Sequence, residues 1–155
     1  MSHDPAAAHA VAETLQRYSS CLIVTHINPE GDAIGSQLAL AMALEQHGIT
    51  VYCYDRDGVP EICRFLPTWE RVCQTLPSPM PPLLVAVDAN SFARCNLTDE
   101  DIAHAEALVR IDHHLCAEPP SGPALVDPAA AAAGELVYEL LPLLDARMTP
   151  EIATC

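Results

Sequence analysis

The fold is decided by the stretch "CLIVTHINPEGDAIGSQLALAMALEQHG", residues 21–48. Its first six residues form a short apolar run rich in β-branched side chains, which predicts a buried strand. A loop that contains two acids follows, and residues 33–47 then predict a long helix, which a glycine ends. The next apolar run, residues 49–55, predicts a second strand. Strand, helix and strand in this order form a βαβ unit, in which two parallel strands are joined by a right-handed crossover.

The rest of the chain continues this alternation. Apolar residues at helical spacing after Asp4-Pro5 predict a capped first helix, and "MTPEIATC" has the capping residues of a helix start. The segment "VPEICRFLP" predicts a short helical turn, and "RVCQTL" predicts a small strand or a turn. The sequence therefore predicts an α/β domain of the Rossmann-like class, with a parallel sheet and helices on both faces. The remaining predicted elements are strands at 83–90, 108–114 and 123–127 and helices at 98–108 and 128–144.

The composition favours one globular domain of a cytoplasmic protein. The chain has 155 residues, of which half are hydrophobic, and this length suits a single core. With 7 basic against 21 acidic residues, it lacks a basic surface that could hold a nucleic-acid backbone unaided. The seven cysteines are odd in number and contain no C-x-x-C pair, which favours reduced thiols over a disulfide framework or a zinc knuckle. Neither a leader peptide nor a membrane segment is predicted.

Three of the predicted strands end in residues of the types that commonly bind metals in proteins. Because the carboxyl ends of parallel strands meet along one edge of a sheet, side chains that are far apart in sequence converge there. Clustered carboxylates repel one another unless cations lie between them, so we expect a metal site. Mixed imidazole and carboxylate ligands suit manganese, iron, zinc or cobalt, of which manganese is the first choice. The converging residues are His26, Glu30, Asp32, Asp88, Asp112, His113 and His114.

The helix that follows the loop acids is a second part of the predicted site. In the segment "GDAIGS", which includes Gly35 and Ser36, backbone N–H groups and the helix dipole would face an anion that the metals hold. Asn90 and Arg94 are candidate phosphate contacts just beyond the Asp88 strand, although a turn former and a surface ion pair explain them equally well. Metal ions, a helix N-terminus and an imidazole together predict hydrolysis of a phosphate ester.

The motifs "HINPEGDAIGSQLAL", "VAVDAN" and "RIDHH" resemble the first three motifs of the DHH phosphoesterase family, which is named for the triplet at residues 112–114. The segments "ALVDPAAAAAGELVYELL" and "MTPEIATC" are similar to its bacterial nanoRNase-type branch. Members of that branch are bifunctional oligoribonucleases that also remove the 3′-phosphate from 3′-phosphoadenosine 5′-phosphate. The resemblance implies a site with two Mn²⁺ ions, for which Mg²⁺ or Co²⁺ can substitute. It also implies a short single-stranded RNA or a nucleotide as substrate, and no membrane partner.

The resemblance further implies a role for each residue of the site. Asp88 bridges the two ions, and Glu30 stands where the family usually has aspartate. Asp112 and His114 are the catalytic pair, in which Asp112 orients its neighbours and His114 contacts the substrate phosphate. By matching positions, the metal ligands are His26, Glu30, Asp32, Asp88 and His113.

Two parts of the family pattern are expected beyond this chain. The fourth motif, which contributes a further aspartate ligand, should follow the helix that begins near Thr149, and a C-terminal DHH-associated domain should bind the substrate. Residues 1–155 are thus expected to be a DHH catalytic domain that ends before its last strand. The alternatives are a non-catalytic fragment that binds a nucleotide or metal, a cyclic-dinucleotide phosphodiesterase, and a family II pyrophosphatase, which the long proline-bearing loop after the triplet disfavours. An exposed apolar face also predicts a possible homodimer.

Overall fold

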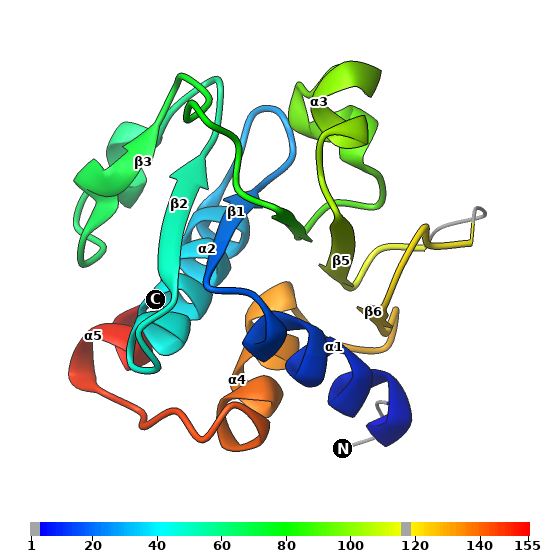
Figure 1. Ribbon diagram of the computed structural model, residues 1–155. Coiled ribbons are helices and arrows are strands. Elements are labelled where there is room, and N and C mark those ends of the chain that lie inside the picture. Colours follow the sequence, from blue (N-terminus) through cyan, green and yellow to red (C-terminus); the bar gives the residue numbers. More distant parts are fainter. Residues whose placement is uncertain (1–3, 116–118) are drawn as a thin grey trace.

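A computed structural model describes residues 4–115 and 119–155. Within these residues a six-stranded sheet has the order β3-β2-β1-β4-β5-β6, and every pair of neighbouring strands is parallel (Figure 1). This confirms the predicted Rossmann-like α/β architecture. The strands are β1 (Ser20–Val24), β2 (Thr50–Tyr54), β3 (Val72–Cys73), β4 (Leu83–Val87), β5 (Ala107–Asp112) and β6 (Ala124–Val126).

The strand order reverses between β1 and β4. From β1 the chain moves outward to β2 and β3, and it then returns to place β4 on the other side of β1. All five residues of β4 are buried, since both faces of the central strands are covered. In open parallel sheets the crevice for a ligand lies outside the carboxyl ends of the strands at such a reversal.

Helices cover both faces of the sheet, as the sequence predicts. Four of them pack on one face around the larger apolar core, whereas α3 and the 3₁₀ turn η3 (Phe92–Cys95) pack on the other (Figure 1). The segment after β2 adds a 3₁₀ turn at Glu61–Cys63, which agrees with the predicted helical turn. The helices are α1 (Pro5–Arg17), α2 (Gly31–Glu45), α3 (Asp99–Ala103), α4 (Ala133–Leu143) and α5 (Pro150–Thr154).

Helix α2 is the element that positions the loop acids. It contacts β1, β2 and β4 on one side and α4 and α5 on the other, so nearly all its side chains are buried. Gln37 lies in its middle, and its Nε2 donates to the carbonyl oxygens of Ile23 at 2.8 Å and Tyr54 at 3.1 Å. These bonds join the helix to the ends of β1 and β2. They hold the N-terminus of α2 beside the reversal in strand order.

The predicted helix over 128–144 is too long at its start. Residues 128–131 form a turn and a bend, and α4 begins at Ala133, where the Asp32 carboxylate accepts hydrogen bonds from the N–H groups of Ala133 and Gly134. In the turn before it, the Asp127 carboxylate accepts from the N–H of Ala129 at 2.7 Å. A capping carboxylate supplied by another helix therefore decides where α4 starts, against the helix propensity of the alanine run.

The predicted helix over 98–108 is also too long. Thr98 and Asp101 form a capping box that starts α3, but the helix ends at Ala103. The apolar residues Ala107 and Leu108, which helical spacing had joined to it, pair with β4 as the first residues of β5. Burial in the sheet thus outweighs the local helical pattern at these residues. Helix α5, by contrast, forms as predicted, with Thr149 as its cap.

The cysteines behave mainly as apolar side chains. Six are free thiols in the described residues, and the seventh, Cys116, lies outside them. Burial raises the pKa of Cys21, Cys53 and Cys95 to about 12, which keeps these thiols protonated. In the described segments no helix has the length and apolarity needed to cross a membrane.

Candidate metal centre

The predicted site residues meet at the carboxyl ends of β1, β4 and β5. His26 lies two residues beyond β1, Asp88 directly follows β4, and His113 directly follows β5. The registers of the strand pairs align these ends, because Val24 pairs with Ala86 and Val87 pairs with Ile111. The site therefore lies at the reversal in strand order, where a parallel sheet binds its ligand.

Asp88 is the centre of the cluster. Its side chain is 0% exposed, and its Oδ2 lies 3.5 Å from Nε2 of His26. Its Oδ1 lies 3.4 Å from Nε2 of His113 and 3.5 Å from Nδ1 of His114. Among the described residues, neither carboxylate oxygen has a hydrogen-bond partner. The residue has a left-handed φ of 55°, and its N–H donates to the carbonyl of Ile111 at 2.9 Å, which fixes the turn after β4.

The electrostatics of Asp88 favour a bound cation. Burial and, to a smaller extent, the nearby acids Asp32 and Glu30 together raise the pKa of this carboxyl to about 7, while His26 acts in the opposite direction. A buried carboxylate that lacks donors and has acidic neighbours is costly to ionise. A divalent cation in contact with its oxygens would remove that cost.

The donor atoms form two groups, each of a kind suited to a metal ion, that share one residue. The first group consists of His26, Glu30 and Asp88, and the second of Asp88, His113 and His114, with the donor atoms in each group within 4.8 Å of one another. Each group mixes imidazole and carboxylate donors, as manganese, iron and zinc sites do. Glu30 reaches the centre despite its longer side chain, since its Oε2 lies 3.2 Å from Nε2 of His26.

Asp32 lies at the edge of the second group. Its Oδ2 is 3.4 Å from Nε2 of His113. Its two oxygens also accept from the N–H groups of Ala133 at 2.7 Å and Gly134 at 3.0 Å, and from Oγ of Ser36 at 3.0 Å. Asp32 thus faces the centre and caps α4 at the same time, so the start of α4 fixes its orientation.

Asp112 holds His114. The Asp112 side chain is fully buried, and its Oδ1 lies 2.8 Å from Nδ1 of His114 and accepts from the His114 N–H at 3.2 Å. The hydrogen bond to Asp112 raises the pKa of His114, while burial and the charge of Arg94 act in the opposite direction. His114 is 47% exposed and Arg94 is exposed, so an imidazole and a guanidinium group border the buried acids.

Gly35 and Ser36 make structural contacts, while their predicted contact with a phosphate stays a prediction. Helix α2 begins at Gly31, so the N–H groups without an intrahelical acceptor belong to residues 31–33. Gly35 is buried in the next turn, and a Cβ there would lie 2.4 Å from the carbonyl oxygen of Cys155. Gly35 therefore allows α2 and α5 to pack closely, and Ser36 supports Asp32.

Replacing Gly35 with alanine is expected to destabilise the chain by about 1–3 kcal/mol, because the added methyl group overpacks the α2–α5 contact. Gly31→Ala is the matched control, since a Cβ at Gly31 meets nothing within 4 Å. It is expected to leave the free energy of unfolding unchanged or to raise it slightly. Urea denaturation of both variants measures the difference. Equal stability of the two would show that the α2–α5 contact is not tight.

Two hydrogen bonds that the sequence did not predict support the loop after β1. Oγ1 of Thr25 donates to Oδ2 of Asp55 at 2.7 Å, and both side chains are buried. The N–H of Asn28 donates to Oδ2 of Asp57 at 2.8 Å. The loop that carries His26 is thus fixed from the end of β2. Asp55 could have been found by the rule that polar residues at strand ends face the site.

Arg110 is a further residue that the sequence analysis missed. It lies within β5, where it is buried, and its Nη1 donates to the carbonyl oxygen of Asn90 at 2.6 Å. Asn90, a predicted phosphate contact, is thereby fixed through its backbone two residues after Asp88. A charged residue inside an otherwise apolar strand, "LVRID", was the available signal.

The geometry agrees with a family comparison. The profile described as "DHH family, N-terminal domain" matches residues 20–155. The chain belongs to the DHH family. It is 36% identical over 147 residues to the "Bifunctional oligoribonuclease and PAP phosphatase NrnA" of Thermus thermophilus, a match that covers 93% of this chain and 43% of that protein. The predicted resemblance to the nanoRNase-type branch is therefore confirmed.

Solved structures show the same fold. An exopolyphosphatase-related protein from Bacteroides fragilis superposes with a TM-score of 0.78 at 21% identity, over 92% of this chain and 45% of that one. The exonuclease RecJ bound to manganese superposes with a TM-score of 0.55 at 16% identity, over 89% and 37% of the two chains. The chain spans less than half the length of each of these three relatives.

Proposed function

We propose that this DHH-family chain forms the catalytic domain of a manganese-dependent phosphoesterase that acts on short oligoribonucleotides, on 3′-phosphoadenosine 5′-phosphate, or on both. The observation that carries the proposal is that two sets of imidazole and carboxylate donors share the buried Asp88. The relative NrnA, named as an oligoribonuclease and PAP phosphatase, supports the substrate class. The manganese in RecJ, a protein of the same fold, supports the choice of metal.

The proposed ligand sets combine the donor geometry with the family pattern. His26 and Glu30 would hold one ion, His113 and the adjacent Asp32 would hold the other, and Asp88 would be a ligand common to both. His114, whose Nδ1 is held by Asp112, is left to contact the substrate. When bound, two such ions supply positive charge at the phosphoryl oxygens and lower the pKa of a water molecule that can attack phosphorus.

The chain's own cations complete the proposed mechanism. Asp112 holds Nδ1 of His114 and favours its protonated form, so the other ring nitrogen can donate a hydrogen bond to a phosphoryl oxygen. Arg94 adds a second positive charge on the exposed side of the site. These groups can bind an anionic substrate locally although the chain carries a formal net charge of −14.

The test couples metal content to turnover. After dialysis against manganese, we expect elemental analysis to give two ions per chain, and we expect the loaded chain to release mononucleotides from a short oligoribonucleotide. Chelation with EDTA should abolish that release. One ion or none, together with no hydrolysis, would contradict the proposal for this chain and would favour the alternative of a binding fragment.

Several expectations from the sequence stay predictions. They include the cytoplasmic location, the homodimer, and the phosphate contacts of Gly35, Ser36, Asn90 and Arg94. Sedimentation of the chain at several concentrations tests the second of them, because a reversible homodimer shifts with concentration.

A further inference from the structure

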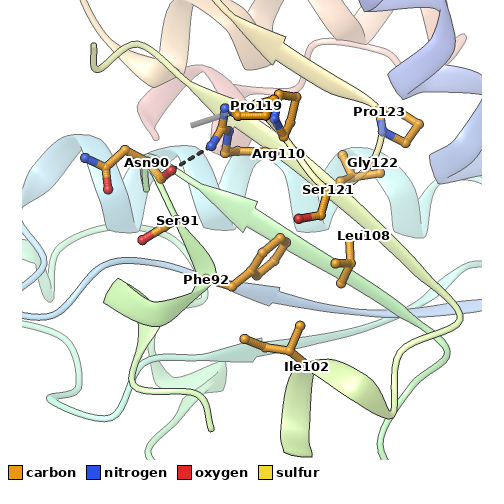
Figure 2. Close-up of a pocket in the computed structure, with 12 residues that line it drawn as sticks. Asn90, Ser91, Phe92, Ile102, Leu108, Arg110, Pro119, Ser121, Gly122 and Pro123 are labelled. Atoms are coloured by element: carbon orange, nitrogen blue, oxygen red, sulfur yellow. Dashed lines mark hydrogen bonds between the residues drawn. The ribbon is translucent and has the colours of Figure 1, made fainter. Parts of the chain in front are cut away.

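A cavity lies close to the metal centre, on the face of the sheet that α3 covers. It has a volume of about 150 Å³ and is formed by the segment after β4, the middle of β5 and the segment before β6 (Figure 2). A cavity of this size can hold a single aromatic ring. Figure 2 shows the apolar side chains of Phe92, Ile102 and Leu108 on one side of it, and Arg110, Pro119 and Ser121 on the other.

We propose that this cavity binds the nucleobase of the nucleotide whose phosphate lies at the metal centre. The inference rests on the proposed function and extends it to the substrate's base. It makes Phe92 a binding residue that stacks on the base, and it makes Arg110 a positioning residue for the cavity wall.

The position of the cavity suits a base attached to that phosphate. Asn90 follows Asp88 by two residues, and Arg110 precedes Asp112 by two residues, so in each case the Cα atoms are at most ~7 Å apart. Both the cavity and the metal centre are therefore built on β4 and β5 and their direct continuations. One ribose separates base from phosphate in a nucleotide, and one short step along these strands separates the two parts of the site.

The cavity wall is fixed by specific contacts. The buried Arg110 donates from Nη1 to the Asn90 carbonyl oxygen at 2.6 Å, which anchors the segment that continues to Phe92 (Figure 2). On the opposite side, a Cβ at Gly122 would lie 2.2 Å from the carbonyl oxygen of Leu108, so only glycine lets the segment before β6 lie so close to β5. The space is thus largely preformed.

The chemistry of the lining favours a base over a second phosphate. Phe92 presents an aromatic ring, and with Ile102 and Leu108 it makes one side of the cavity apolar, which would desolvate a phosphate without compensation (Figure 2). Every nucleobase has a π face that can stack on such a ring. Ser121 offers a hydroxyl group to the polar edge of a base, as small-molecule sites commonly do (Figure 2).

The test compares two ligands that differ only in the base. With manganese present, the chain is expected to bind uridine 5′-monophosphate, whose base is a single ring, about tenfold more tightly than ribose 5-phosphate, the size expected from one base–aromatic stack. Phe92→Leu keeps the apolar packing but removes the ring, so it should abolish the difference, whereas Phe92→Tyr should retain it. The other phenylalanine of the chain, Phe65, is exposed, so Phe65→Leu is the matched control and should also retain the difference in affinity. The affinity for ribose 5-phosphate should be the same in all four proteins.

The outcomes separate this inference from the proposed function. If both ligands bind equally and in a manganese-dependent way, the base cavity is overturned while the phosphate site stands. If Phe92→Leu weakens both ligands alike, Phe92 acts through the phosphate site, and the cavity is again excluded as a base site. If neither ligand shows manganese-dependent binding, the proposed function fails and this inference fails with it.

Discussion

Replacing Asp88 with asparagine is expected to lower the rate of phosphodiester hydrolysis at least ~100-fold and to reduce the bound manganese to fewer than two ions per chain. Asp88 belongs to both groups of donor atoms, and its side chain is fully buried between His26 and His113. A neutral amide of the same shape keeps the packing but is a poor metal ligand. Equilibrium dialysis and a single-turnover assay on a short oligoribonucleotide measure the two effects.

The exposed Asp99 in the first turn of α3 offers a matched control. Asp99→Asn makes the same chemical change outside the cluster, and we expect it to bind two ions and turn over at the original rate. Asp112→Asn should have an intermediate effect of about 10–100-fold, because Asp112 acts through His114. A rate for Asp88→Asn within threefold of the original would exclude Asp88 as a shared ligand.

The sequence predicted the convergence of the site because that convergence follows from topology. Apolar runs that end on His26, Asp88 and Asp112 needed only the rule that parallel strands share a carboxyl edge. The structure brings these three residues to one place. The βαβ unit was equally predictable, since a single glycine after a long helix and two apolar runs leave few alternatives.

The boundaries that sequence reasoning missed depend on contacts between distant residues. Nothing near Ala133 indicates that α4 starts there, because the capping carboxylate belongs to Asp32, about a hundred residues earlier. The same contact explains why Asp32, predicted as a metal ligand, is also a structural residue. Local propensity contains no information about such a partner.

The contact partners of Gly35 and Arg110 could not be predicted for the same reason. A glycine near a helix start is typical of an anion site, and the structure adds a close neighbour of Gly35, the carbonyl of Cys155 in a helix that packs across it. In the sequence, Arg110 is an unexplained charge within an apolar strand. The structure shows that its side chain donates a hydrogen bond to the Asn90 carbonyl. Such contacts depend on how helices and strands pack against one another, and a single sequence contains no direct information about that packing.

The metal-free chain is expected to lose stability as the pH rises from about 4 to about 7. Burial holds the pKa of Asp88 near 7 in the folded chain, against 3.8 for an ordinary aspartate. Between these values the unfolded chain has released the proton that the folded chain retains, so the contribution of Asp88 to stability is fully present below pH 4 and is lost by pH 7. The loss should amount to about 2–4 kcal/mol. Urea denaturation in the presence of EDTA at pH 4, 5, 6 and 8 measures it.

Asp88→Asn isolates this contribution from those of the other carboxyl groups. Because asparagine does not titrate, the metal-free variant should lack this part of the pH dependence and should be more stable than the original chain at pH 8. Manganese should reverse the order, since it binds the ionised carboxylate of the original chain and stabilises only the folded state. The residue that destabilises the chain without metal is then the one through which metal stabilises it. If the free energy of unfolding depended equally on pH in the two proteins, Asp88 would ionise in the folded chain at no cost. The electrostatic argument for Asp88 as a shared metal ligand would then be wrong.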